Sequence, residues 1–512
     1  MLIKVFGAAV QGISATLITI EVNCSRGIKF LVVGLPDVSV KEGHERIVSA
    51  INENGFKFPR KQIVINMSPA DIRKEGSAYD LPLAIGILAA SESIKPDKLA
   101  DYIMMGELSL DGKILPIKGA LPIAIMAKEN GYKGFILPRE NAKEAAVVEG
   151  IDVYGVESIS EVTGFMNGEL ELEKTFVDIE KEFHQNQLLF EYDFSDVKGQ
   201  ESVKRALEVA AAGGHNIIMI GAPGSGKSMM AKRMPSILPP FTTDEALETT
   251  KIHSVAGKLE DNISIMTHRP FRAPHHTISN VAMVGGGAFP QPGEISLAHN
   301  GVLFLDELPE FNRSVLEVMR QPLEDRAITI SRARFSIDYP ASFMLVSAMN
   351  PCPCGYYNHP DRECVCKPGT VQKYLNKISG PLLDRIDIHI EIVPVPFEKI
   401  SERSLSENSK EISKRVIKAR KIQIERFKDT PGVYNNAQMN SKLLNKYAVP
   451  DEAGLRLLKT AMERLSLSAR AYDRILKVSR TIADLDDSKD IKSIHIAEAI
   501  NYRNLDRETW AG

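Results

Sequence analysis

Apolar and polar positions follow two distinct patterns along the first 168 residues. Short runs with the continuous or every-second hydrophobicity of β-strands occupy residues 30–36, 62–68 and 134–138. Longer runs, whose apolar residues recur at helical spacing, occupy residues 45–55, 81–93 and 121–131. Strands that alternate with amphipathic helices indicate an α/β domain over residues 1–168.

The same criterion divides the rest of the chain. Residues 169–190 are strongly charged and contain neither Gly nor Pro, which predicts a helical or irregular connector. Residues 191–396 again combine short apolar strands with helices, so we expect a second α/β domain. Residues 397–512 have almost entirely the pattern of amphipathic helices, which predicts a third, helical part.

Composition indicates a globular protein of more than one domain. The 512 residues exceed what one hydrophobic core serves, and 44% hydrophobic with 25% charged residues excludes a mostly disordered chain. No apolar run reaches the roughly 18 residues of a membrane span, and Gln11 and Glu21 interrupt the first apolar stretch. We therefore expect a cytoplasmic protein with no membrane partner. The net charge is −3, so any nucleic-acid surface must come from local clusters of Lys and Arg.

A glycine-rich loop between a short strand and a helix carries the strongest chemical signal. Backbone N–H groups of such a loop surround phosphate oxygens, its lysine contacts the β- and γ-phosphates, and its last hydroxyl reaches Mg²⁺. The residues of the loop are Gly221, Ala222, Pro223, Gly224, Ser225, Gly226, Lys227 and Ser228. The sequence therefore predicts ATP and Mg²⁺ as cofactors.

Two carboxylates follow a later strand of the buried type. The apolar residues 301–305 lead directly into Asp306 and Glu307. Because parallel strands meet ligands at their carboxyl ends, we expect Asp306 to hold the water shell of Mg²⁺ and Glu307 to activate the attacking water. Glu307 thus predicts hydrolysis rather than binding alone. The structural alternative is a pair of solvated carboxylates at a strand end.

Two further polar residues complete the candidate site. Asn350 ends the apolar strand 342–349, where it could orient the same water, although Asn at a strand end is also a common turn residue. Arg385 lies between Asp384 and Asp387 after a helix-like stretch. Spacing alone favours an intrahelical ion pair for this arginine.

Four of the five cysteines fall within one stretch of the chain, as two Cys-x-Cys pairs: Cys352, Cys354, Cys364 and Cys366. Four thiolates match the ligand set of a closed tetrahedral zinc site, although the spacing within each pair is tighter than usual. His359 could replace one sulfur. The alternatives are a structural Zn²⁺ and an unmetallated loop of buried thiols. Because the stretch follows Asn350, a metal here would brace the ATP site and take no part in the chemistry.

The motifs in this order resemble a known family. The glycine loop, LFLDE (303–307), SAMN (347–350) and LLDRID (382–387) resemble the AAA+ ATPases of the magnesium-chelatase-like clade, in particular its YifB/ComM group. Longer segments typical of this group are 269–279, 285–311, 321–335 and 468–485. The resemblance covers essentially the whole chain and implies an ATP-hydrolysing enzyme.

The resemblance also implies roles for individual residues. Asn350 corresponds to the sensor-1 residue, and Arg385 corresponds to the arginine finger that acts on the nucleotide of a neighbouring subunit. Arg470 corresponds to the sensor-2 arginine of the helical lid. A finger that acts in trans requires a closed ring, so the implied assembly is a homo-hexamer. The catalytic residues expected are Lys227, Asp306, Glu307, Asn350, Arg385 and Arg470.

Residues 1–168 resemble the Lon protease domain, a fold like ribosomal S5 domain 2, through segments 73–91 and 105–125. The protease chemistry is missing. Ala78 stands in register with the nucleophilic serine of that protease and Leu121 with its lysine base, and a serine without an amine base is not activated. A one-residue gap would bring Ser77 into register. We expect a non-proteolytic scaffold or DNA-handling domain.

The family role that the resemblance implies is DNA translocation. The leading hypothesis is a ring ATPase with helicase or branch-migration activity on single-stranded or branched DNA, in recombination during natural transformation and beside other recombination proteins. The alternative is a magnesium-chelatase-like motor that remodels a protein partner. A nucleotide switch with little turnover is disfavoured by Glu307.

Three segments bear on this choice. Arg332 and Arg334 lie in a hairpin-like stretch that faces the pore in related motors, and residues 414–428 form a basic helix; both favour DNA, although a solvated helix face has the same composition. Residues 267–297 resemble the helix-2 insertion of the clade. Its pair His275–His276 is expected to be structural and hydrogen-bonded.

Overall fold

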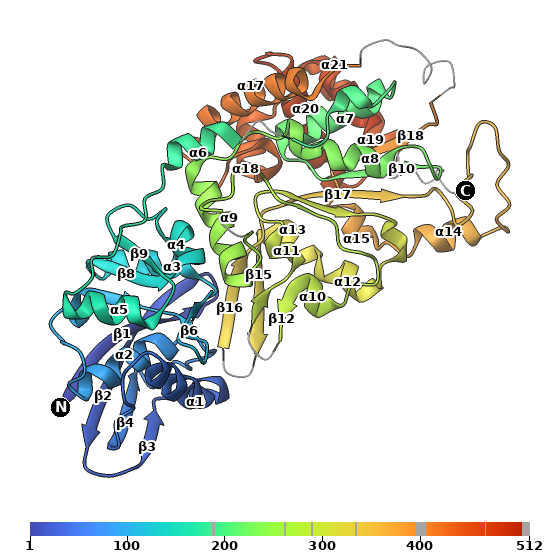
Figure 1. Ribbon diagram of the computed structural model, residues 1–512. Coiled ribbons are helices and arrows are strands. Elements are labelled where there is room, and N and C mark those ends of the chain that lie inside the picture. The colour runs from blue at the N-terminus through green and yellow to red at the C-terminus, as the bar shows by residue number, and fades with distance from the viewer. Residues whose placement is uncertain are drawn as a thin grey trace. The chain divides into compact units, whose positions relative to one another are not determined.

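The computed structural model describes residues 1–186, 190–260, 263–287, 290–332, 335–395, 406–465 and 467–503. The chain packs as two compact units, and Figure 1 labels the elements of both. The first unit comprises Met1–Gln185 with Thr243–Thr267, and the second comprises Asn186–Thr242 with His268–Gly512. Residues 243–267 thus pack with the first unit, although they lie between the glycine loop and LFLDE in the sequence.

A seven-stranded mixed sheet forms the centre of the first unit, in the order β3-β4-β2-β1-β5-β8-β9. Strand β2 is antiparallel to both β1 and β4, and the other pairs of neighbours are parallel. The strands are β1 (Leu2–Gln11), β2 (Ser14–Ser25), β3 (Phe30–Val33), β4 (Gln62–Ser68), β5 (Tyr102–Met104), β8 (Gly134–Pro138) and β9 (Asp152–Val156), with the small hairpin β6 (Glu107–Leu108) and β7 (Ile114–Leu115). The three strands expected from the apolar runs are β3, β4 and β8.

Helices pack on this sheet. All eleven residues of α2 are buried, because its sequence is apolar on every side and it lies against β1 and β2. The helices of this unit are α1 (Val38–Glu53), α2 (Asp80–Ala90), η1 (Leu99–Asp101), α3 (Ala120–Glu129), α4 (Arg139–Ala145), α5 (Ile159–Asn167), α6 (Ile179–Asn186) and α9 (Thr243–Ala256). The α/β class expected for this part of the chain is confirmed.

A five-stranded parallel sheet forms the centre of the second unit, in the order β11-β14-β17-β10-β18. Every residue of its three central strands is buried, as expected for a parallel sheet with helices on both faces. The strands are β10 (Ile217–Gly221), β11 (Phe271–Arg272), β14 (Val302–Leu305), β17 (Met344–Met349) and β18 (Ile388–Ile392). This is the second α/β domain that the sequence predicts.

Short helices and turns surround this sheet. Helix α7 packs beside β18 and against the C-terminal helices, and α8 leads away from the glycine loop. These elements are η2 (Phe194–Asp196), α7 (Glu201–Gly213), α8 (Lys227–Arg233), η3 (Met234–Ile237), α10 (Asn280–Val284), α11 (Glu294–Leu297), η4 (Leu308–Glu310), α12 (Arg313–Val318), α13 (Arg320–Asp325), α14 (Thr370–Leu375) and α15 (Gly380–Leu383).

The C-terminal part of the second unit is helical, as the amphipathic pattern predicts. Four of its helices begin at a side chain that accepts a backbone N–H three residues later, which fixes where each helix starts. Those caps are Asn408, Asn440, Asp451 and Ser468. The elements are α17 (Ser409–Phe427), η5 (Asn436–Gln438), α18 (Ser441–Tyr447), α19 (Glu452–Arg464), α20 (Ala469–Leu485) and α21 (Ser493–Asn501).

Two small antiparallel hairpins project from the second unit. The first is β12 (Gly285–Gly286) with β13 (Gln291–Pro292), and the second is β15 (Ala327–Arg332) with β16 (Phe335–Pro340). Strand β15 ends at Arg332, whose side chain lies outside the description, and Arg334 lies outside the described residues.

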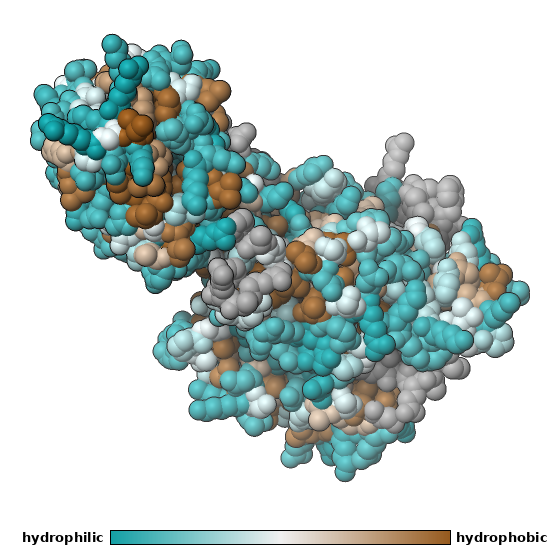
Figure 2. All heavy atoms as spheres, turned by 90° about the horizontal axis from the view of Figure 1, so that it is seen from below, coloured by the Kyte–Doolittle hydropathy of each residue, from teal (hydrophilic) through white to brown (hydrophobic). Residues whose placement is uncertain are grey.

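Figure 2 shows the hydropathy of one face of the molecule. Hydrophilic side chains cover most of that face, and hydrophobic ones are interspersed among them. Among the described residues, no helix has both the length and the apolarity needed to cross a membrane.

Candidate active site

The carboxyl ends of three neighbouring strands meet at one edge of the second unit's sheet. Strands β14, β17 and β10 are parallel, with Leu305 opposite Ser347 and Ile220 opposite Met349. The segments that follow these strands are the two carboxylates, the polar strand end and the glycine loop. Their common edge is where parallel sheets bind ligands.

Two glycines of the loop are required by its geometry. Gly226 begins helix α8 with φ +90°, a conformation that other residues rarely adopt. At Gly221, an added Cβ would lie 2.6 Å from the carbonyl oxygen of Ile392 on the neighbouring strand β18. The loop therefore turns closely against the sheet edge, with its backbone free of side chains at these two points.

Lys227 is the first residue of helix α8, at the end of the loop, and is buried. Its Nζ donates to the carbonyl oxygens of Gly221 (2.7 Å) and Ala222 (2.9 Å) and to Oδ1 of Asn350 (3.2 Å). Burial lowers the pKa of Lys227, and the carboxylates of Asp306 and Glu307 act in the opposite direction. The ammonium group is thus held at the loop by weak acceptors that a phosphate oxygen can replace.

Ser228 and Asp306 face each other across the edge. The Ser228 hydroxyl donates to Oδ2 of Asp306 at 2.6 Å. A hydroxyl and a carboxylate at this separation are oxygen ligands of the kind that Mg²⁺ prefers, directly or through water. The residues present therefore fit an Mg²⁺ ion, which would neutralise the phosphates and orient them.

The side chain of Glu307 contacts a residue that the sequence interpretation did not predict, His276. The backbone of Glu307 is left-handed (φ 52°), and an oxygen of its carboxylate lies 3.3 Å from Nδ1 of His276. The sequence interpretation treated His276 as a structural histidine, yet it contacts the carboxylate expected to activate water. The signal was its position: His276 follows strand β11, which is parallel to β14 and therefore approaches the same edge.

Arg385 lies in a different cluster. It is buried, and its guanidinium donates to the carboxylate of Glu324 on α13 and to the carbonyl of Pro381. The intrahelical ion pair that spacing favoured is therefore wrong, because Glu324 belongs to another helix. Neither partner is part of the Lys227 cluster.

The residues on either side of Arg385 are also paired across elements. Asp384 accepts from Arg470 on helix α20 at 3.3 Å, so the two candidate arginines lie close together. Asp387 is buried and pairs with Arg474 at 3.0 Å. Burial would raise the pKa of Asp387, but Arg474 and His215 hold it well below its usual range. This pairing ties the arginine segment to α20.

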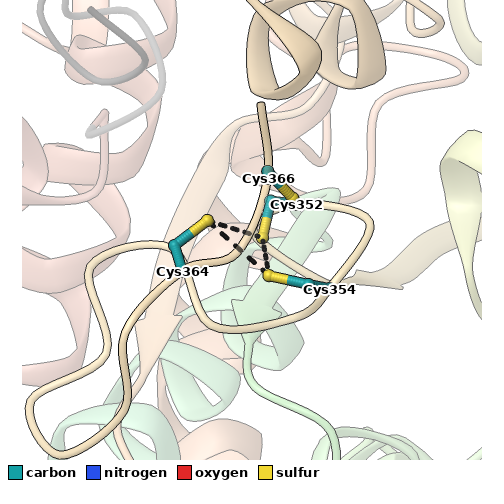
Figure 3. Close-up of side chains that lie close together, drawn as sticks. All are labelled: Cys352, Cys354, Cys364 and Cys366. Carbon is teal, nitrogen blue, oxygen red and sulfur yellow. Dashed lines mark hydrogen bonds between the residues drawn. The ribbon is translucent and has the colours of Figure 1, made fainter. Parts of the chain in front are cut away.

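The four cysteines form one cluster. Figure 3 shows the side chains of Cys352, Cys354 and Cys364 turned toward one another, with Cys366 beside them. The four sulfurs all lie within 4.8 Å of one another. In the described part of the chain, the group that can hold a metal contains these four residues, and His359, which accepts the backbone N–H of Asp361, is not among them.

The basic helix α17 has most of its charge neutralised within the chain. Arg415 pairs with Glu208 and Glu407, and Lys418 pairs with Asp487. Further pairs are Lys414–Glu411, Arg426–Asp484 and Lys428–Glu425. These contacts favour a structural role for the helix and weaken it as a DNA-binding element.

The first unit contains a serine with a carboxylate partner. Ser77 donates to the side chain of Glu107, and Lys74, which is buried, donates to the carbonyl of Pro69. Leu121, in register with the lysine base of Lon, is buried and apolar. The hydroxyl of Ser77 is therefore bonded to an acid, in contrast to the serine–amine pairing of that protease.

The order of the parallel sheet, the glycine loop with Lys227 and the carboxylates after β14 define a P-loop ATPase of the AAA+ class. The chain belongs to the magnesium-chelatase-like family of ComM and YifB. Residues 193–400 match the family described as magnesium chelatase, subunit ChlI. Residues 20–141 match subunit ChlI of Mg-chelatase, and residues 406–503 match the C-terminal region of that subunit.

Two relatives cover almost the whole chain, and a third covers a part of it. Competence protein ComM of Haemophilus influenzae is 43% identical over 509 residues, covering 98% of this chain and 97% of the relative. YifB of Escherichia coli is 43% identical and covers 98% and 96%. Lon protease 2 of Bacillus subtilis is 30% identical over 141 residues, covering 27% of this chain and 25% of the protease. The first unit is accordingly a Lon-like domain.

The geometry predicts two separable defects at the ATP site. Lys227→Ala should raise the Kd for ATP about 10- to 100-fold, because the phosphates lose a charge-assisted hydrogen bond. Glu307→Gln should retain ATP binding and lower the hydrolysis rate about 100-fold or more, because the water loses its base. Nucleotide-binding titration and phosphate release measure the two effects. Normal turnover by Glu307→Gln would refute the assignment of Glu307.

Proposed function

We propose that this chain is the subunit of a ring-shaped ATPase that moves along DNA and drives branch migration or unwinding during recombination after DNA uptake. The observation that carries the proposal is the 43% identity, over 98% of the chain, to a relative named competence protein ComM. Competence is the state in which a cell takes up DNA, so a motor with this role acts on incoming strands.

The candidate active site supports a motor that turns over. Lys227, Ser228 and Asp306 have the side chains to hold MgATP, and Glu307 directly follows Asp306, so we propose that it activates the attacking water. Repeated hydrolysis is what continuous movement along a polymer requires. A protein that only switches between nucleotide states has no need of such a carboxylate.

The separation of the arginine cluster from the Lys227 cluster supports a ring. Arg385 and Arg470 lie together through Asp384 and are bonded to residues other than those of the glycine loop. A neighbouring subunit that offers its bound γ-phosphate would give Arg385 a stronger anionic partner than Glu324. A head-to-tail interface that repeats in this way closes into a cyclic assembly, and we propose a homo-hexamer.

The hairpin of β15 and β16 is the element that we propose contacts DNA. Arg332 is the last residue of β15, and Arg334 follows it by two positions in the sequence, whereas the cations of α17 are largely paired with carboxylates. Arginines that contact phosphates bind DNA of any sequence, which suits a translocating motor.

A rival function has its own support. The matched families are described by a magnesium chelatase subunit, which favours a motor that remodels a protein partner. The two functions share the ATP site and differ in the polymer that stimulates it. DNA stimulation of the ATPase therefore decides between them.

Arg385→Ala should leave the Kd for ATP nearly unchanged and lower turnover about a thousandfold, because the missing charge acts on the nucleotide of the neighbouring subunit. Both quantities are measured on the purified oligomer. A fully active Arg385→Ala oligomer would refute the assignment of Arg385 as the arginine finger.

Mixing provides the matched control for this prediction. Arg385→Ala subunits retain an intact glycine loop, and Lys227→Ala subunits retain an intact finger, so mixed rings can assemble complete sites at some interfaces. Recovery of activity on mixing would indicate action between subunits. A defect of Arg385→Ala in ATP affinity alone would assign the residue to its own site instead.

DNA should stimulate the ATPase, and its apparent affinity should fall steeply with salt as counterions are released. Replacing both Arg332 and Arg334 with Ala should reduce the stimulation and lower the slope of log K against log salt by about one for each phosphate that the protein no longer neutralises. Basal hydrolysis should survive, because the glycine loop and Glu307 are unchanged. ATPase assays with single-stranded, duplex and forked DNA across a salt series measure these effects.

The double variant Lys414→Ala/Lys418→Ala is the control, since it removes the same charge from helix α17, where both lysines are paired with carboxylates. It should retain DNA stimulation. An oligomer that neither binds forked DNA at low salt nor unwinds it would favour the protein-remodelling function.

A further inference from the structure

We infer that the four cysteines bind one structural zinc ion, and that this ion fixes the loop that supports the phosphate-binding residues. The metal site stands on its own geometry. The effect on nucleotide affinity rests on the proposed ATP site, so the two parts are tested separately.

The positions of the sulfurs match a tetrahedral metal site. A zinc ion with Zn–S bonds of about 2.3 Å separates its four sulfurs by about 3.8 Å, the edge of the tetrahedron. The observed separations are 3.3 Å for Cys352–Cys354, 3.8 Å for Cys352–Cys364 and 3.6 Å for Cys354–Cys364. All four cysteines are free of disulfides. Sulfurs that bind one metal ion each lie close to several others, as here, whereas a disulfide brings together only two sulfurs.

The chemistry of the four ligands also suits zinc. Four soft thiolates with tetrahedral spacing select zinc over Mg²⁺, and a closed set of four leaves no open position for chemistry.

The stretch that contains the cysteines has little else to hold it. Residues 350–369 include neither helix nor strand, so few backbone hydrogen bonds fix their path. Of the four cysteines, only Cys352 is fully buried. A metal that joins the two Cys-x-Cys pairs would supply the folding free energy that this stretch lacks.

The cysteine loop contacts the glycine loop directly. At Gly355, between the two Cys-x-Cys pairs, an added Cβ would lie 2.5 Å from Cδ of Pro223. Gly355 also has φ +86°, which favours glycine. The backbone of the cysteine loop therefore lies against Pro223 of the phosphate-binding loop, with no side chain of its own between them.

The cysteine loop is also linked to Asn350, which follows strand β17. Cys352 follows Asn350 by two residues, and Asn350 accepts from Lys227. An ion held by the cysteines would thus fix the chain on both sides of this link, at Pro223 through Gly355 and at Asn350 through Cys352.

The metal itself is tested on the full-length protein. Elemental analysis of freshly purified protein should give about one zinc per chain, and replacing it with Co²⁺ should produce the visible absorption of a tetrahedral cobalt thiolate. Cys364→Ala should lose the metal, whereas Cys364→His should retain it, because imidazole is also a zinc ligand. Cys24→Ala, at the cysteine of strand β2 in the first unit, is the control and should keep full zinc content. Protein that contains no metal and takes up neither Zn²⁺ nor Co²⁺, or that contains iron instead, would overturn the zinc site.

The proposed effect of the zinc ion on the ATP site is tested by measuring nucleotide affinity. Removal of zinc by a chelator should raise the Kd for ATP about tenfold and lower the thermal midpoint, and added Zn²⁺ should reverse both changes. Gly355→Ala should raise the Kd similarly while keeping its zinc, because the new Cβ pushes Pro223 away. If zinc is bound but neither treatment changes the Kd, the coupling to the ATP site is wrong and the metal site stands. DNA-independent hydrolysis would count against the proposed function and leave this inference unaffected.

Discussion

The parallel arrangement of five strands is the constraint on which the rest of the second unit depends. Because β14, β17 and β10 run in the same direction, whatever follows each strand emerges at one edge. That edge collects the glycine loop, the two carboxylates and Asn350 from positions up to 129 residues apart, between Gly221 and Asn350. The cysteine cluster follows the same strand end as Asn350, so a candidate metal site and the ATP site share one support. An antiparallel neighbour would have sent one of these groups to the opposite edge.

The Lys227 cluster and the Arg385 cluster differ in the charge of the groups that accept their hydrogen bonds. At the sheet edge, the Lys227 ammonium is bonded to two carbonyls and an amide oxygen, which are neutral acceptors that an incoming phosphate can displace at small cost. Arg385 is bonded to the carboxylate of Glu324, so its engagement by a phosphate requires the loss of an ion pair. An anion can therefore reach Lys227 without breaking an ion pair, whereas it cannot reach Arg385 in this way. The proposed ring would supply the competing anion at Arg385.

The first unit shows how a fold can be kept while its chemistry changes. Its sheet and helices belong to the Lon-like class, yet Ser77 is bonded to Glu107 and the position of the lysine base is the buried Leu121. Without an amine to take its proton, a serine hydroxyl is a weak nucleophile. The apolar residue at position 121 packs in the core instead. The scaffold or DNA-handling role that the sequence predicts for this unit stays a prediction.

Local patterns in the sequence were enough to predict several of the elements, such as β3, β4 and β8, and to name the candidate residues of the ATP site. A glycine loop has to follow a buried strand and precede a helix, so Gly221–Ser228 is readable without a structure, and so are the carboxylates that end an apolar run at Asp306. Partners distant in the sequence were decided by the tertiary structure alone. The pairing of Arg385 with Glu324, of His276 with Glu307, and of the α17 cations with acids depends on which elements lie side by side. Sequence spacing records neighbours along one helix or strand, whereas these contacts join elements that the packing of the sheet and helices brings together.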